Sequence, residues 1–160
     1  MRVVGEGVAV PSRGVAPDDL AGEQRSFARV RAGRIVEVHV RRLADRSDVE
    51  LLRAQVKATL RLAGPGPVIC ADHRLASLQS WDAADTWSKA MRGSGSGVVR
   101  SGLLLDPANA MYNLQIERVV QRAGNPVLRL FADFDELREW VGEVLAEHER
   151  EALRNLFSDA

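Results

Sequence analysis

Apolar residues alternate with polar ones soon after residue 26, and this pattern predicts that the fold opens with a β-hairpin. Three valines at 36, 38 and 40 occupy every second position, so they share one face of a strand. A shorter apolar run over 27–31 precedes them, and Ala32-Gly33 between the two runs is typical of a tight turn. We therefore expect paired strands over 27–31 and 34–42, with the second strand buried on its valine face only.

The pattern then changes to helical spacing over 49–63. Ser47 and Glu50 have the spacing of a capping box, in which each side chain bonds a free backbone amide at the helix start. The sequence Gly-Pro-Gly-Pro at 64–67 ends this helix. The apolar run over 68–71 that follows is typical of a fully buried strand.

A buried strand, or the turn after one, leads into an amphipathic helix three more times before the C-terminus. Ser80 and Asp133 each precede a helical pattern and are expected to cap it. The last helix should be long, because its apolar stripe continues as far as Phe157. The elements predicted in this part of the chain are helices over 81–91, over 112–123 and from 134 onward, and strands over 98–105 and 127–131.

Each helix that follows a buried strand implies a crossover connection and parallel pairing with the next strand. The expected fold is therefore α/β, with a mixed, mostly parallel sheet that is opened by a β-hairpin and has helices packed on it (ββαβαβαβα). Residues 1–25 are rich in Gly and Pro and should form a flexible N-terminal arm. Residues 26–148 should form the α/β domain, and residues 149–160 should extend its last helix.

This order of elements resembles the STAS domain, named for sulfate transporters and bacterial anti-sigma-factor antagonists, over roughly residues 27–145. The closing segment carries the more specific likeness. Arg129-Leu130-Phe131, then Asp133, Asp135-Glu136-Leu137 and Trp140-Val141, is similar to the end of small STAS-like proteins related to the sporulation anti-sigma antagonist. The resemblance implies a non-enzymatic bacterial signalling module that binds other proteins.

The same resemblance bears on regulation. In STAS domains that are switched by phosphorylation, an Asp-Ser pair begins the helix after the third strand. The corresponding pair here is Asp82-Ala83, and alanine cannot accept a phosphate. The resemblance therefore implies a module that lacks the usual phosphorylatable serine.

Composition narrows the function classes. The 22 basic and 22 acidic residues balance, so no net charge draws the protein to nucleic acid or to an anionic membrane. The single cysteine, Cys70, lies in an apolar run and favours a reducing compartment. No apolar run is long enough for a signal peptide or a membrane span. We expect a cytoplasmic protein without a nucleic-acid partner.

Polar side chains follow several predicted strands, at the sheet edge where α/β folds bind ligands. Asp72, Asp106 and Asp133 would together hold a magnesium ion if they converged, although aspartates at such places commonly cap turns and helices. His73 and Arg74 lie at the same edge and could serve as a base or an anion clamp. The candidate ligand-binding or partner-binding residues are Asp72, His73, Arg74, Asp82, Asp106, Asn109 and Asp133.

Three functions stay open at this point. The first is a protein-interaction module that binds a protein partner or a second copy of itself. The second is a carrier for a small apolar molecule or lipid, which needs a cavity beneath the helices. The third is a magnesium-dependent phosphoryl-transfer enzyme, which needs the three aspartates to converge. The sequence assigns no catalytic residue, metal-ligand set or cofactor, and the expected interaction surface comprises Trp81, Trp87, Leu153, Leu156 and Phe157.

Overall fold

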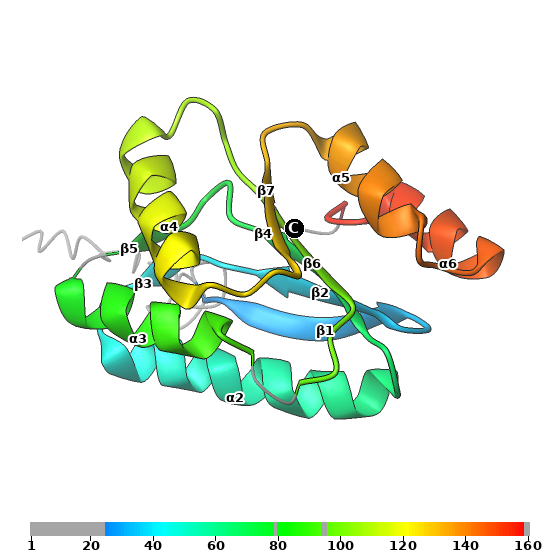
Figure 1. The fold of residues 1–160 in the computed structure, drawn as a ribbon, viewed down its shortest axis with the longest axis horizontal. Coiled ribbons are helices and arrows are strands. Elements are labelled where there is room, and N and C mark those ends of the chain that lie inside the picture. The colour runs from blue at the N-terminus through cyan, green and yellow to red at the C-terminus, as the bar shows by residue number, and fades with distance from the viewer. Residues whose placement is uncertain (1–24, 79, 94–95, 159–160) are drawn as a thin grey trace, which may run out of the picture.

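A five-stranded sheet forms the centre of the computed structural model, which describes residues 25–78, 80–93 and 96–158 (Figure 1). Apart from Arg25, the N-terminal arm predicted over 1–25 lies outside the described residues. The strand order is β1-β2-β4-β6-β7; β1 pairs antiparallel with β2, and every later pair is parallel. The predicted α/β fold, with a mixed and mostly parallel sheet opened by a hairpin, is confirmed. The strands are β1 Phe27–Ala32, β2 Ile35–His39, β4 Val68–Asp72, β6 Arg100–Leu104 and β7 Leu128–Phe131.

Helices cover both faces of this sheet. The connections between successive parallel strands all step in the same direction, and right-handed crossovers of that kind place their helices on one face. The helices that follow the last strand pack on the opposite face (Figure 1). The first face carries α2 (Arg46–Ala63), α3 (Trp81–Met91) and α4 (Ala110–Ala123), and the second carries α5 (Phe134–Gly142), α6 (Glu147–Ala152) and the 3-10 turn η1 (Leu153–Asn155).

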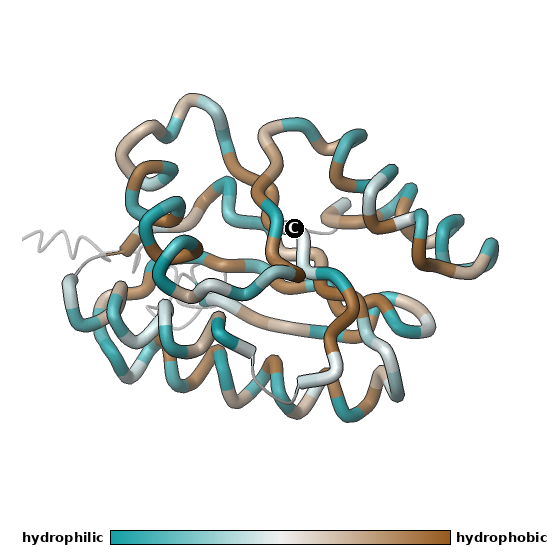
Figure 2. Tube along the Cα trace, viewed as in Figure 1, coloured by the Kyte–Doolittle hydropathy of each residue, from teal (hydrophilic) through white to brown (hydrophobic). Residues whose placement is uncertain are grey.

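Two short strands that the sequence did not predict, β3 (Arg42–Leu43) and β5 (Ser77–Leu78), pair with each other at the end of the molecule near α3 and α4. Hydropathy follows the layers, because the central strands are mostly hydrophobic while the helices alternate between hydrophobic and hydrophilic positions (Figure 2). Within the described ranges, each helix is too short or too polar to cross a bilayer.

Two of the three predicted helix caps are confirmed. The side chains of Ser80 and Asp133 accept hydrogen bonds from backbone amides three residues later, at 3.1 and 3.0 Å. The capping box at Ser47 is wrong, because α2 begins at Arg46 and its cap is Asp45, which accepts a hydrogen bond from the amide of Asp48 at 3.1 Å. Aspartate in extended backbone serves this role as well as serine does.

The prediction of one long last helix, extended through 149–160, is wrong. α5 ends at Gly142, and the chain turns through α6 and η1 back onto the sheet. Leu153, Leu156 and Phe157 are only 3, 3 and 6% exposed, so they form core rather than the expected interaction surface. The physical reason is that β2 and β4 carry apolar residues on this face as well, and one helix cannot cover it.

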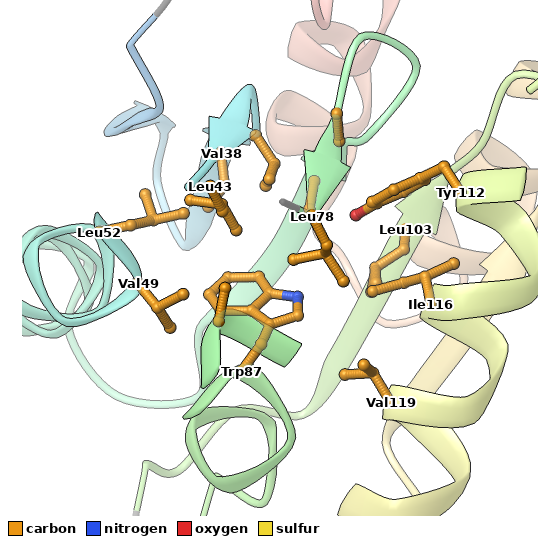
Figure 3. Packing of buried hydrophobic residues seen from close by; sticks show 14 of the residues in the cluster. Val38, Leu43, Val49, Leu52, Leu78, Trp87, Leu103, Tyr112, Ile116 and Val119 are labelled. Atoms are coloured by element: carbon orange, nitrogen blue, oxygen red, sulfur yellow. The ribbon is translucent and has the colours of Figure 1, made fainter. Parts of the chain in front are cut away.

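Trp87 was also expected at the surface and is instead buried, at 7% exposure. Its indole lies between Val49 and Leu52 of α2 on one side and Ile116 of α4 on the other (Figure 3). Trp81, the remaining residue of the expected surface, is 79% exposed.

The hairpin turn holds the returning C-terminal segment. Gly33 has a φ of +50°, and a Cβ at this position would lie 2.6 Å from Oε1 of Glu149. The Glu149 carboxylate accepts hydrogen bonds from the backbone amide and guanidinium of Arg34, with the shortest of these at 2.9 Å, and from the amide of Ala146. The bonds from Arg34 outweigh burial and lower the pKa of Glu149 to about 2.

We expect Glu149→Gln to lower the free energy of unfolding at pH 7 by about 1.5–3 kcal/mol, the usual value of a hydrogen bond to a charged group. Because the folded pKa is about 2, below the ordinary value of 4.5, the carboxylate stabilises the fold fully above about pH 5. That contribution is lost as the pH falls towards 2. Chemical denaturation at pH values across this range should show that the free energy of unfolding falls more steeply for the parent chain than for the variant. Glu151→Gln, at an exposed position of the same helix, is the control, and equal stability of all three proteins at pH 7 would contradict the assignment.

Candidate functional site

A cavity of about 640 Å³ lies between α2, α3 and the face of the sheet that they cover. Small side chains leave this space, among them Ala71 on β4, Ala90 on α3 and Ser101 on β6. Protein interiors are otherwise packed with few voids larger than a water molecule, and small-molecule sites have volumes of about 300–1,000 Å³. The cavity therefore has the size of a ligand site. Its apolar lining includes Val38, Val40, Val56, Leu60, Ile69, Met91, Leu103 and Leu128.

A second depression, between α5 and α6, is more open and is lined mostly by charged side chains. It offers little apolar surface to a ligand.

His73, which directly follows the C-terminal end of β4, is one of the residues that line the cavity. The residue is 1% exposed, and its backbone amide donates to the carbonyl of Leu104 at 2.9 Å. Burial lowers the pKa of His73 to about 3, although the charge of Asp72 opposes the shift. The imidazole is therefore neutral near pH 7.

The hydroxyl of Tyr112 determines which nitrogen of His73 carries the proton. Burial raises the pKa of Tyr112, so the hydroxyl keeps its hydrogen, and its oxygen lies 2.6 Å from Nδ1 of His73. No other partner of this hydroxyl occurs in the described part of the chain. Since a buried hydroxyl hydrogen needs an acceptor, we assign Tyr112 as donor to Nδ1 and the imidazole proton to Nε2. His73 thus presents an N–H donor at Nε2.

Trp87 also lines the cavity and carries a second buried donor. Its ring centroid lies 6.3 Å from that of His73, and Figure 3 shows its nitrogen on the side of the ring towards Leu103. Among the residues that the structure describes, neither Nε1 of Trp87 nor Nε2 of His73 has a hydrogen-bond partner. Buried donors in folded proteins are normally satisfied. Both side chains line the cavity, while the two nitrogens themselves are enclosed by protein.

The α2 side of the cavity is basic. Arg53, Lys57 and Arg61 lie four residues apart along the helix, so they project on one side of it, and all three are exposed. Within the described ranges none of the three forms an ion pair, whereas Lys89 on α3 pairs with Asp85 at 2.9 Å. The cavity therefore combines a mainly apolar lining with exposed positive charge on its α2 side.

A separate polar cluster lies on the opposite face of the sheet. The prediction that β2 is buried on one face only is wrong, because Glu37 and His39 are 0% exposed. Nε2 of His39 lies 2.6 Å from Oε1 of Glu37, which also pairs with Arg29 at 2.9 Å. The ring of His39 stacks on Phe27, with centroids 4.5 Å apart. The charged groups of this cluster pair with one another, although Oε2 of Glu37 lies 3.7 Å from the nearest guanidinium nitrogen of Arg31 and forms no hydrogen bond within the described residues.

Phe157 closes this cluster from the C-terminal segment. Its ring meets that of His39 edge-on at 5.5 Å, and it packs against Phe134 with centroids 5.7 Å apart. Phe157 has a φ of +65°, which is uncommon for a residue other than glycine and is maintained here by the surrounding packing.

Asp72 and Arg74 bind each other in this second cluster, so neither is available to a ligand in the cavity. Burial alone would raise the pKa of Asp72, but hydrogen bonds from the side chain and backbone amide of Arg74, at 2.9 to 3.0 Å, outweigh it and hold the pKa below its ordinary value. The pair is a two-point ion pair at the end of β4.

The other predicted site residues are dispersed. Asp106 accepts a hydrogen bond from the amide of Ala108 and shapes a turn, and Asp133 caps α5. The amide of Asn109 bonds the carbonyl of Ala76 at 3.4 Å, and Asp82 is exposed in the first turn of α3. No group of three acidic, His or Cys side chains among the described residues is placed to hold a metal ion, so the convergence of the three aspartates that a magnesium site requires is not found there.

Of the seven predicted ligand-binding residues, only His73 lines the cavity. Its position in the sequence contains a signal, since it is two residues beyond Ala71 and so falls on the same face of the strand. Trp87 and Tyr112 could not be paired with it from spacing, because 39 residues separate Tyr112 from His73. Comparisons with known protein families, with curated proteins and with solved structures found no match for this chain.

We expect ¹⁵N NMR of the imidazole to show His73 as the Nε2–H tautomer and neutral from pH 8 down to about pH 4. Tyr112→Phe removes the donor to Nδ1 and should redistribute the tautomers. Titration of His73 near pH 6.5, or an Nδ1–H tautomer in the parent chain, would contradict the assignment.

Proposed function

We propose that this protein is a non-enzymatic binding protein for a small, mainly apolar molecule, which it holds between α2, α3 and the sheet. One observation carries the proposal: a cavity of about 640 Å³ with a mainly apolar lining lies between these two helices and the sheet. Apolar walls supply affinity in such sites, and a few polar groups orient the ligand.

The chemistry of His73 supports binding rather than catalysis. With a pKa of about 3, the imidazole accepts a proton poorly near pH 7. Its Nδ1 is already engaged by Tyr112, so the group can offer only a neutral donor at Nε2. A buried imidazole that stays neutral near pH 7 adds no charge to the apolar lining.

We further propose that the chain is a STAS-like regulatory domain and that it works in the cytoplasm of a bacterium. The hairpin-first order of elements supports this, as does the packing of Phe131 at the end of β7 against Trp140 of α5, with ring centroids 5.4 Å apart. Ala83, at the place of the phosphorylated serine, is buried and has no hydroxyl. A ligand in the cavity would then act without phosphorylation at this position.

Filling the cavity should abolish binding. We expect Ala90→Phe to reduce the affinity for the neutral apolar dye Nile red by about tenfold or more, because the added ring occupies the space that the dye needs. The measurement is dye fluorescence against protein concentration. Ala58→Phe, which adds the same ring to an exposed position of α2 outside the cavity, should leave the affinity unchanged. Equal loss in both variants, or no binding by the parent chain, would contradict the proposal.

A protein-interaction module is the second candidate, and Trp81 is the observation that favours it. This side chain is 79% exposed at the start of α3, and exposed tryptophans are enriched among residues that dominate protein interfaces. The occupant that we propose is a second copy of the chain.

If Trp81 lies in such an interface, Trp81→Ala should shift the protein from dimer to monomer with little change in its melting temperature. Light scattering over a range of concentrations measures the mass. The matched control is Leu62→Ala, at an 81% exposed residue near the C-terminal end of α2. A parent chain that is monomeric at every concentration would contradict this second candidate.

A further inference from the structure

Positive charge gathers on α2 and α3, although the chain as a whole has no net charge. From residue 53 to its end, α2 carries three cations and no acidic residue, and two further cations lie at the end of α3. All five are exposed, and no acidic residue occurs among the described residues that line the cavity with them. We call these five the basic face; they are Arg53, Lys57, Arg61, Lys89 and Arg92.

The basic face is not neutralised by its surroundings. Within the described ranges its three α2 cations form no ion pair. On α3, Asp85 pairs with Lys89 at 2.9 Å. The hydrogen bond and charge of Lys89 lower the pKa of the Asp85 carboxyl, and the charges of Arg122 and Arg92 add to the effect. A single carboxylate therefore lies among several cations, which leaves an excess of positive charge.

The helix dipoles do not account for this arrangement. Cations complement the C-terminal end of a helix only within its last turn. Arg61 and Lys89 lie in the last turns of α2 and α3, but Arg53 and Lys57 precede the last residue of α2 by ten and six positions. The α2 cations follow one another at intervals of about one helical turn, so they form a row that extends well beyond the helix end.

The opposite face of the molecule is acidic. Residues 134–155, which form α5, α6 and η1, contain seven acidic and three basic residues. The charges that balance in the sequence are therefore segregated across the sheet. A negatively charged surface would attract the basic face and repel the opposite one, so it would both hold and orient the protein.

We propose that the basic face docks this protein on the anionic surface of a lipid bilayer. Clusters of about four to eight Lys and Arg residues on a helical surface are typical of peripheral binding to anionic lipids. Leu62, which is 81% exposed beside Arg61, adds an apolar side chain that can enter the boundary between head groups and acyl chains. Binding of this kind needs no helix that crosses the membrane.

The choice of a bilayer over another polyanion rests on the proposed function. A mainly apolar ligand is concentrated in membranes, and its cavity lies between the two helices that carry the basic face. Proteins that hold single-stranded nucleic acid stack its bases on accessible aromatic rings. Trp87, the aromatic residue that lines the cavity with these cations, is only 7% exposed. These observations favour a lipid surface.

The test is vesicle flotation with the full chain at low salt. The probes are vesicles of phosphatidylcholine alone and vesicles of phosphatidylcholine mixed with the anionic lipid phosphatidylglycerol. We expect the mixed vesicles to bind the protein about tenfold or more tightly than the neutral ones. The preference should disappear at about 1 M salt, where screening limits electrostatic attraction to about 3 Å.

Two double variants assign the preference to the basic face. Each basic residue near an anionic surface strengthens binding about fivefold, so Arg53→Gln with Lys57→Gln should weaken binding to mixed vesicles about tenfold to thirtyfold. Arg150→Gln with Arg154→Gln removes two exposed cations from the opposite face and is the matched control. It should bind as tightly as the parent chain. Melting temperatures check that both variants are folded, and the salt series tests the parent chain independently of them.

The outcomes separate docking from ligand binding. No binding to mixed vesicles, equal binding to neutral ones, or equal loss in the two double variants would overturn the proposal. Displacement from vesicles by duplex DNA or polyglutamate at equal charge concentration would assign the basic face to a nucleic acid or an acidic protein instead. Nile red binding is measured without vesicles. Dye binding without vesicle binding rejects only the docking surface, whereas vesicle binding without dye binding rejects only the proposed function.

Discussion

Burial of β2 and β4 on both faces is the constraint on which the rest of this structure depends. Both strands lie inside the sheet and carry apolar residues on either side, so each face needs its own cover. Three crossover helices cover the first face because right-handed connections place them there. The second face can be covered only by the part of the chain that follows β7. It is covered by α5 and by the segment that turns back onto the sheet after Gly142. The position of Phe157 over His39 is a consequence of this requirement.

Buried polar groups are accommodated differently on the two faces of the sheet. On the second face the charges pair with one another, as Glu37 with His39 and Asp72 with Arg74, and aromatic rings pack against them. On the first face two N–H groups stay without an acceptor among the described residues, beside a cavity. Pairing lowers the cost of burying charge, so the ion pairs of the second face stabilise the fold, while the space for a ligand lies on the first face.

Local signals predicted local features well. Period-two valines located β2, helical spacing located α2, α3 and α4, and the side chains of Ser80 and Asp133 capped helices as expected. Signals that needed a knowledge of neighbours failed. The apolar stripe beyond residue 149 was interpreted as an interaction surface, because a sequence does not show that one face of the sheet still needs a segment to pack on it. Trp87 was assigned to the surface for the same reason, since only the approach of α2 and α4 buries it.

The sequence by itself therefore determined the order of strands and helices, the hairpin and the mostly parallel sheet, because these follow from periodicity and chain connectivity. Only the tertiary structure decided that His73, Trp87 and Tyr112 meet, that Asp72 is neutralised by Arg74, and that a cavity lies beneath α2 and α3. Except for Asp72 and Arg74, which are two residues apart, these are contacts between residues far apart in the chain or between faces of different elements. Side-chain volume and packing determine them, and neither can be deduced from spacing along one chain.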